Sequence, residues 1–259
     1  MKLSSVKGKK MKKIKNKVWG VIESLVVFVL KVIKTKYLDK KDPSPLDFLK
    51  VDAARDGYDT FSKYMSSSMI FQTRPDMRSF VIRESLKLLD GSVEVKKPLF
   101  LEFGVAGATS TNHFATLLSK SDVKIYGFDA FLGLEEDWLG MHRGRTAGAY
   151  SYQGNLPNVS KNVELIVGWL QETLVDFLDK YKTGTIVFAH FDMDTYSPGR
   201  YGLEKIKPFL RKGSILLFDD FYAYPGWRNN DFKSLNELFT DKEYEFIAFS
   251  HTEAAIRIL

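Results

Sequence analysis

The chain has 259 residues, of which 44% are hydrophobic and 27% are charged. This composition is typical of a globular protein and excludes disordered, collagen-like and coiled-coil chains. A single core can cover this length, although two small domains also fit it. The sequence contains no cysteine. Disulfides, thiolate zinc sites and a cysteine nucleophile are therefore excluded, and any metal must bind oxygen or imidazole ligands.

The charge is unevenly distributed along the sequence. Of the 38 basic and 32 acidic residues, the first 41 positions hold 13 Lys and two acids, Glu23 and Asp39. The N-terminal segment (1–41) therefore carries +11, and the remaining 25 bases and 30 acids leave the body at −5. A nucleic-acid enzyme normally carries its basic surface on the catalytic domain. We therefore predict no nucleic-acid partner.

An apolar run, VWGVIESLVVFVLKVI, covers residues 18–33. As a helix it rises about 24 Å, less than the roughly 30 Å of hydrocarbon that a spanning helix crosses. Helical spacing places one apolar stripe on it, made of Val18, Ile22, Leu25, Val26, Val29 and Ile33. The pattern predicts either a helix in an anionic membrane surface, with contact through residues 1–36, or a helix packed on protein. No small-residue cleavage site follows, which disfavours a signal peptide. We expect a cytoplasmic protein, at the inner face of the membrane if the first alternative holds.

The turn-rich stretch DPSPLDF (42–48) separates this segment from a helical region that extends to residue 97. In that region a helix is expected from Asp76, an acidic cap, to Gly91. From 98 to 259 short apolar runs alternate with helical stretches, which predicts strands at 98–103, 123–128, 163–167, 185–191 and 214–220. Runs that are apolar throughout are typical of strands buried on both faces of a parallel sheet.

The last two β-rich runs, EYEFIAFS and AAIRIL, are joined by only a few residues and must pair as an antiparallel hairpin. The predicted fold is therefore a doubly wound, Rossmann-like α/β domain over residues 98–259. Its sheet has seven mostly parallel strands and an antiparallel C-terminal hairpin.

Ligands bind beyond the carboxyl ends of the strands in such a sheet. The first run ends in Glu102, and Gly104 and Gly107 follow in a turn where missing side chains let a ligand approach the backbone. The second run ends in Asp129, which can accept both hydroxyls of a ribose. Taken alone, Glu102 is equally a helix-cap acid and Asp129 a solvated loop acid, but the pair indicates an adenosine-containing ligand. Ala106 replaces a glycine of the dinucleotide fingerprint, which disfavours a nicotinamide enzyme.

Four aspartates follow the fourth and fifth runs. Asp192 and Asp194 come after His190, and Asp219 and Asp220 end the next run. Asp192 and Asp194 point to one side if the extended conformation continues. Four carboxylates in one cleft repel unless protons or a cation neutralise them, which favours Mg²⁺, with Mn²⁺ or Ca²⁺ as alternatives. We interpret His190 as a core histidine with a hydrogen-bonded ring.

From Pro98 to about Leu238 the chain resembles the class I S-adenosylmethionine-dependent O-methyltransferases of the macrocin type, which methylate sugar hydroxyls. The matching motifs occur in the family's order and are LEFGVAGATS, YGFDAFLGLEEDW, NLPNVSKNVELIVGWLQETL, HFDMDTYSP and GSILLFDDFYAYPGW. The resemblance implies S-adenosylmethionine (AdoMet) held by the turn from Glu102 through Gly104 to Gly107, with its ribose on Asp129.

The resemblance also implies adenine near Gly168 and Trp169, and Mg²⁺ on Asp192, Asp219 and Asp220. In such an enzyme Asp194 is the general base and the protein is a homodimer. The implied acceptor is a small-molecule or lipid-linked sugar.

Two other functions compete with this hypothesis. Asp192-Met193-Asp194 is also a D-x-D motif, which is typical of metal-dependent glycosyltransferases. Such an enzyme has no use for the turn at 102–107. A non-catalytic, membrane-associated binding protein is the other alternative. AdoMet binding separates the methyltransferase from both.

Overall fold

The structure is a computed structural model that describes residues 19–20, 22–31, 43–90, 95–140 and 145–259. The chain divides into two compact units, Met1–Pro45 and Leu46–Leu259, and the division falls inside the linker expected at 42–48. In the first unit residues 19–20 and 22–31 are helical. Val18 and Ile33, at the ends of the predicted apolar stripe, lie outside the described residues. No helix in the described ranges is long and apolar enough to cross a membrane.

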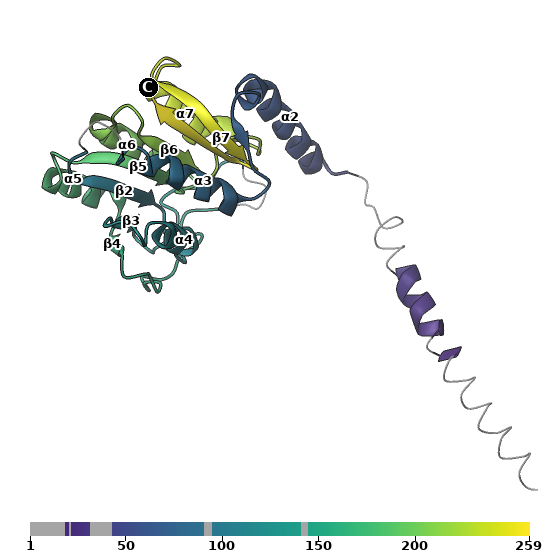
Figure 1. The fold of residues 1–259 in the computed structure, drawn as a ribbon. Coiled ribbons are helices and arrows are strands. Elements are labelled where there is room, and N and C mark those ends of the chain that lie inside the picture. The colour runs from purple at the N-terminus through teal and green to yellow at the C-terminus, as the bar shows by residue number, and fades with distance from the viewer. Residues whose placement is uncertain (1–18, 21, 32–42, 91–94, 141–144) are drawn as a thin grey trace, which may run out of the picture. The chain divides into compact units, whose positions relative to one another are not determined.

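The second unit is built on one eight-stranded sheet with the order β1-β7-β8-β6-β5-β2-β3-β4 (Figure 1). The strands are β1 (Met69–Ile70), β2 (Pro98–Phe103), β3 (Ile125–Asp129), β4 (Val163–Val167), β5 (Thr185–Phe191), β6 (Ile215–Phe218), β7 (Tyr244–Ser250) and β8 (Glu253–Ile258). All neighbouring strands are parallel except that β8 runs antiparallel to both β6 and β7. The predicted doubly wound sheet with an antiparallel C-terminal hairpin is confirmed. The sequence predicted seven strands and missed β1, because two residues show no periodicity.

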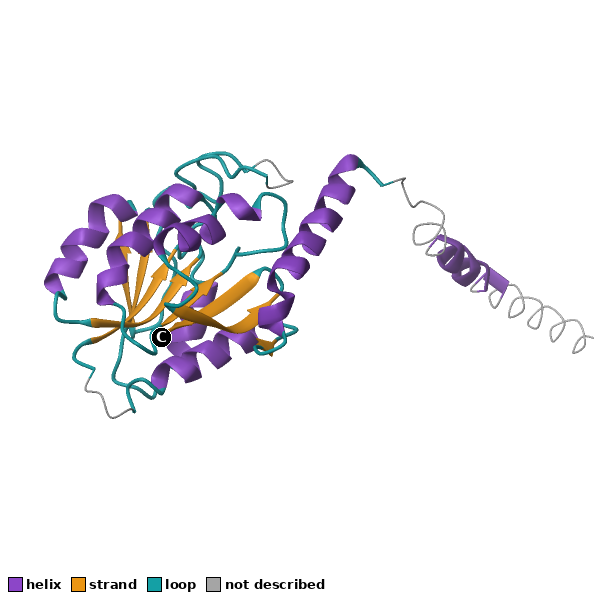
Figure 2. Cartoon of the chain, turned by 90° about the horizontal axis from the view of Figure 1, so that it is seen from above, coloured by secondary structure: helices purple, strands orange, loops and turns teal. Residues whose placement is uncertain are grey.

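Helices cover both faces of this sheet (Figure 2). They are α2 (Pro45–Met65), α3 (Arg74–Leu86), α4 (Thr109–Leu117), α5 (Leu170–Lys180), α6 (Tyr196–Ile206) and α7 (Asp231–Leu238). The predicted N-cap of α3 is wrong by three residues. Thr73, not Asp76, is the N-cap, and its hydroxyl oxygen accepts the Asp76 N–H at 3.3 Å. The Thr73 hydroxyl in turn donates to Asp76 Oδ2 at 2.6 Å, so the predicted acid supports the cap without being the cap residue.

Successive side chains of the central strands pack alternately in two separate hydrophobic cores, one on each face of the sheet. On β2, Leu101 and Phe103 pack on one side of the sheet, and Phe100 packs on the other. The same alternation occurs on β6, where Leu216 and Leu217 belong to different cores. Since both faces are apolar and covered, the strands read as continuous hydrophobic runs in the sequence. This is why their positions were predictable.

Phe61 anchors the C-terminal half of α2 to the sheet unit. Its ring is 2% exposed. It lies within 6 Å, centroid to centroid, of the rings of Phe221, Tyr222, Trp227, Phe232, Phe246 and Phe249. Aromatic groups from α2, β7 and the segment after β6 therefore meet at one side chain.

We expect Phe61→Ala to lower the free energy of unfolding by about 3–5 kcal/mol, because it removes a buried ring and leaves a cavity. Tyr58→Ala is the matched control on the same helix, since Tyr58 is 62% exposed, and it should change stability by less than about 0.5 kcal/mol. Urea unfolding followed by circular dichroism measures both. Equal effects of the two substitutions would contradict the anchoring role of Phe61.

Candidate active site

The carboxyl ends of β2, β3, β5 and β6 lie side by side, and their hydrogen bonding continues one residue past the strands. Gly104 N–H donates to Phe128 O at 2.9 Å, Asp192 N–H to Phe103 O at 2.8 Å, and Asp219 N–H to Phe191 O at 3.0 Å. The first residues after each strand are thus held in a row. This is the edge where ligands bind in doubly wound sheets.

Gly104 is required by the packing of this row. Its φ is +89°, and a Cβ there would lie 1.9 Å from the carbonyl oxygen of Asp192. The sequence predicted a glycine turn that lets a ligand approach. The structure shows that the missing side chain of Gly104 also lets the end of β5 approach β2.

The turn after β2 is held by the carboxylate of Asp129. One carboxylate oxygen accepts the N–H groups of Val105 and Ala106, each at 2.8 Å, and the other accepts the Phe131 N–H at 2.6 Å. Ala106 takes a left-handed φ of +46°, the conformation that a glycine of the dinucleotide fingerprint would favour. Three of the roughly four acceptor positions of the carboxylate are thus occupied, and one stays free on the oxygen that accepts the Phe131 N–H.

A cavity of about 480 Å³ opens at this edge of the sheet. Its wall includes most of the predicted site residues, namely Gly104, Asp129, Gly168, Trp169, Asp192, Asp194, Asp219 and Asp220. The volume is in the range of small-molecule and cofactor sites. The structure thus brings together the acids of three strand ends with the residues expected near adenine.

Glu102 and Gly107 are absent from the wall of this cavity. Glu102 is fully buried, and its Oε1 lies 3.0 Å from Nδ1 of the equally buried His190. A Cβ on Gly107 would lie 2.8 Å from the Tyr152 hydroxyl oxygen. Glu102 thus contacts His190 inside the protein, Gly107 leaves room for the Tyr152 hydroxyl, and the roles of both residues toward AdoMet stay predictions.

Asp194 sits in a strained turn. Its φ is +65°, and Thr195 N–H donates to Met193 O at 2.7 Å across it. The extended conformation of β5 therefore stops before Asp194, and Asp192 and Asp194 are not alternating strand residues. A left-handed non-glycine residue costs about 1–2 kcal/mol, and such strain persists mainly at functional sites.

Asp192, Asp194 and Asp220 hold their protons more tightly than free aspartate does. Burial and the charges of Asp220 and Asp219 raise the pKa of Asp194 to about 8. Burial and Asp219 raise the pKa of Asp220 to about 6. Burial raises the pKa of Asp192 well above its ordinary range, and the neighbouring aspartates add to this shift. Asp194 and Asp220 share a hydrogen bond, which requires a proton on one of them.

Two arginines of α3 bind the site, and the sequence analysis missed both. Arg74 Nη1 donates to Asp219 Oδ2 at 2.8 Å, and Arg78 pairs with both Asp219 and the buried Glu253. Burial raises the pKa of Asp219, but a hydrogen bond with Glu253 and the charges of Arg74 and Arg78 together hold it below its ordinary value. No local sequence pattern indicates that either arginine contacts Asp219, because α3 lies far from β6 in the sequence.

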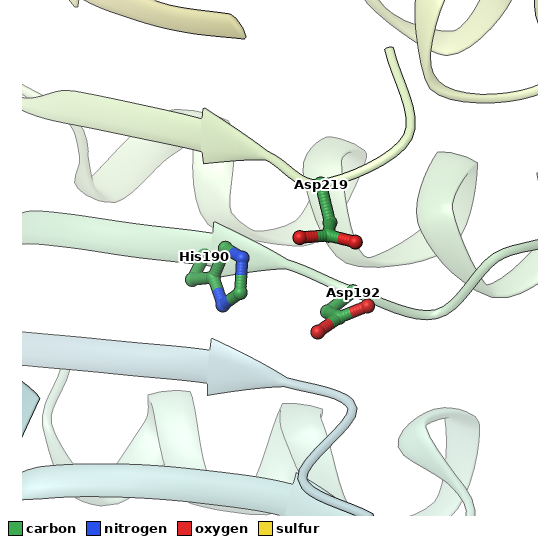
Figure 3. A group of neighbouring side chains, drawn as sticks. All are labelled: His190, Asp192 and Asp219. Atoms are coloured by element: carbon green, nitrogen blue, oxygen red, sulfur yellow. The ribbon is translucent and has the colours of Figure 1, made fainter. Parts of the chain in front are cut away.

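The chemistry of the donor set fits a divalent cation. One ligand atom from each of His190, Asp192 and Asp219 lies within 4.8 Å of the others (Figure 3). His190 Nε2 is buried without a hydrogen-bond partner among the described residues, and its Nδ1 contact with Glu102 is typical of metal-bound histidines. No ion pair in the described part of the chain involves Asp192, Asp194 or Asp220.

The predicted metal triad differs from this arrangement at one position. Asp220 is outside the close group, and its Oδ1 accepts the Thr252 hydroxyl at 3.2 Å. His190 stands in the group in its place. The reason is strand geometry: His190 and Asp192 are two residues apart at the end of β5 and point to the same side. His190 is also the core histidine with a hydrogen-bonded ring that the sequence predicted, since it is fully buried and its Nδ1 lies 3.0 Å from Glu102 Oε1.

Comparison with known proteins agrees with this architecture. Residues 101–221 match the protein family described as a methyltransferase domain. No curated protein sequence matches the chain. The crystal structure of CalS11, a calicheamicin methyltransferase, is similar with a TM-score of 0.54 and 20% identity, over 84% of this chain and 94% of that one. An apo structure of CalS11, described as a TDP-rhamnose 3'-O-methyltransferase, is similar with a TM-score of 0.51 and the same identity, over 84% of this chain and 96% of that one.

The O-methyltransferase NovP is similar with a TM-score of 0.52 and 18% identity, over 71% of this chain and 79% of that one. At these identities the likeness shows the fold. Residues 101–221 therefore correspond to a methyltransferase domain, in a chain with a Rossmann-like α/β fold. The resemblance to methyltransferases stated from the sequence is confirmed at this level.

The raised pKa values predict how stability depends on pH in the metal-free protein. Unfolding returns Asp194 and Asp220 to ordinary values near 3.8, whereas the folded protein holds their protons up to about pH 8 and 6. Between about pH 4 and 8 the folded state therefore binds more protons, and the free energy of unfolding falls as pH rises through this window.

Asp194→Asn should reduce this fall by at least about 1 kcal/mol, because one titrating group is removed. Denaturant unfolding at several pH values in the presence of a chelator measures it. Asp176→Asn on the exposed face of α5 is the control and should leave the pH dependence unchanged. An Asp194→Asn profile parallel to the wild type would contradict the protonation of this site.

Proposed function

We propose that this methyltransferase transfers a methyl group from AdoMet to a hydroxyl of a sugar or sugar-containing acceptor, with Mg²⁺ at the acidic cluster. The observation that carries the proposal is one cavity that holds both Asp129, at the end of β3, and the strained Asp194 after β5. A donor site and a proton acceptor are thus available in the same space. The sugar acceptor is supported by the CalS11 structures, one of them described as a TDP-rhamnose 3'-O-methyltransferase.

The nucleoside end of AdoMet is assigned to the β2–β3–β4 side of the cavity. Asp129 offers its remaining lone pair to a ribose hydroxyl, while its bonds to Val105 and Ala106 keep the carboxylate in place. Gly168 and Trp169 line the same side after β4, and an aromatic ring beside adenine adds apolar contact. AdoMet supplies an electrophilic methyl group on a sulfonium.

Asp194 is the general base of the proposal. A base is most effective when its pKa lies near the working pH, and the pKa of Asp194 is about 8. The hydroxyl oxygen takes the methyl group as the carbon–sulfur bond breaks, and the proton of the hydroxyl goes to a carboxylate oxygen of Asp194. The shared hydrogen bond with Asp220 keeps this carboxylate oriented.

Asp192 and Asp219 would hold Mg²⁺, with His190 or Asp220 as the third ligand. A bound Mg²⁺ supplies a Lewis acid that lowers the pKa of a sugar hydroxyl. Glu102 orients the His190 ring through Nδ1, and Arg74 and Arg78 hold the Asp219 carboxylate in one position. These residues position the proposed ligands without touching the acceptor.

The two competing functions have less support. The D-x-D motif lies inside the region that matches the methyltransferase domain. Its second aspartate, Asp194, has a left-handed backbone conformation, whereas Asp192 does not. A non-catalytic binding protein has no need of a strained acid beside a cavity. Homodimerisation stays a prediction.

Calorimetric titration of AdoMet tests the donor site. We expect saturable binding by the wild type and a loss of roughly tenfold to a hundredfold for Asp129→Ala, because a charged acceptor of hydrogen bonds is removed. Asp122→Ala, an exposed acid before β3, is the matched control and should bind AdoMet normally. A folded wild type that does not bind AdoMet would overturn the methyltransferase proposal.

Asp194→Asn tests the base. Transfer of a labelled methyl group to nucleotide sugars, including TDP-rhamnose, should fall more than about a hundredfold, while AdoMet affinity changes less than twofold because Asp194 is not on the donor side. Asp176→Asn should retain activity. The assay is repeated after chelation of divalent cations. Unchanged activity without them would exclude the metal, and an active Asp194→Asn variant would exclude the base.

A further inference from the structure

The helix in the N-terminal unit exposes apolar side chains on all sides. Six consecutive apolar residues, Leu25 to Leu30, are each exposed, with Leu25 at 63% and Phe28 at 64%. Trp19 and Ile22 extend the apolar surface toward the N-terminus. One turn of a helix takes 3.6 residues, so these six face every direction, and Glu23, Ser24 and Lys31 form only a narrow polar strip on one side. A helix of this kind is stable in water only when apolar material surrounds it.

A protein surface covers one side of a helix, and the other sides of this helix would still expose Val, Leu and Phe. A bilayer surrounds a helix on most of its circumference. The apolar surface is therefore better matched by lipid than by the second copy of the chain or by the catalytic unit.

The charges flanking this helix indicate the kind of lipid. Residues 1–41 hold 13 Lys and two acids, and eight of the lysines precede the helix between residues 2 and 17. Each Lys near an anionic bilayer contributes about 1 kcal/mol of attraction. Two copies of this segment, each at +11, would repel one another. Charge complementarity thus favours anionic phospholipid over self-association.

The length of the apolar run limits how it binds. The sixteen residues from 18 to 33 rise about 24 Å as a helix, against roughly 30 Å of hydrocarbon. None of the described helices meets the length and hydropathy of a membrane span. Lysines flank the run on both sides. In a bilayer their ammonium groups would keep both ends of the helix at the level of the lipid headgroups.

We propose that the N-terminal segment binds the surface of an anionic phospholipid bilayer, with the helix at residues 22–31 in the boundary between headgroups and acyl chains. The lysines pair with lipid phosphates, and Leu25 and Phe28 enter the apolar layer. The proposal is independent of the methyl acceptor. AdoMet titration and vesicle binding therefore fail or succeed separately.

Co-sedimentation of the full chain with vesicles tests the proposal. We expect binding to phosphatidylcholine vesicles that contain phosphatidylserine, weaker binding to phosphatidylcholine alone, and a loss of affinity as salt rises. Equal binding to both vesicle types, or none to either, would overturn it.

Phe28→Asp and Leu25→Asp should each weaken vesicle binding by more than about tenfold, because an apolar group is lost and a repulsive charge is added. Val175→Asp, on α5 and 42% exposed, places the same charge on the catalytic unit and should leave vesicle binding unchanged. All variants should give the circular dichroism spectrum and the urea unfolding midpoint of the wild type, which confirms that they are folded. Vesicle binding by Leu25→Asp at wild-type affinity would contradict the role of the helix.

Sedimentation equilibrium without lipid tests the alternative that the helix packs on a second copy of the chain. A dimer that Leu25→Asp converts to a monomer, together with no vesicle binding, would assign the helix to a second copy of the chain and overturn the proposal. A mass unaffected by Leu25→Asp is the expected result.

Discussion

The active-site edge depends on the backbone hydrogen bonds that continue past the ends of the strands. The N–H groups of Gly104, Asp192 and Asp219 each donate to a carbonyl near the end of a neighbouring strand. At Gly104 the backbones approach so closely that any Cβ would meet the Asp192 carbonyl oxygen. The side chains after each strand are therefore held in place before a ligand binds. Such preorganisation contributes to catalysis because the protein does not have to reorganise during the reaction.

This alignment concentrates negative charge, and the protein compensates for only part of it. Arg74 and Arg78 reach Asp219 and Glu253 from α3. Asp192, Asp194 and Asp220 are left with raised pKa values, which shows how unfavourable three further carboxylates are in a partly buried site. A proton shared between Asp194 and Asp220 relieves the repulsion in one way, and a cation beside Asp192 would relieve it in another. Both outcomes suit a site that removes a proton from a weakly acidic hydroxyl.

The two units meet different physical requirements. The unit from Leu46 onward buries its apolar residues on both faces of the sheet and carries a net negative charge. The N-terminal unit has a helix whose exposed apolar side chains face most directions, flanked by lysines. Opposite charge and opposite exposure of apolar groups within one chain support the proposal that the two units have separate roles, chemistry in one and attachment to lipid in the other.

Periodicity and strand-end residues were enough to predict the doubly wound sheet, its reversed C-terminal strand and the acids beside the cavity, because these are local properties of the chain. Other features required the tertiary structure. Arg74 and Arg78 contact Asp219 across 145 and 141 residues, and no local pattern reports such a contact. His190 joins Asp192 because β5 stays extended between them, whereas Asp194 leaves that line in a turn with positive φ. The sequence alone thus determined which residue types stand at the strand ends. The packing of strands and α3 decided which of them meet, since side-chain directions depend on backbone conformation and on partners distant in the chain.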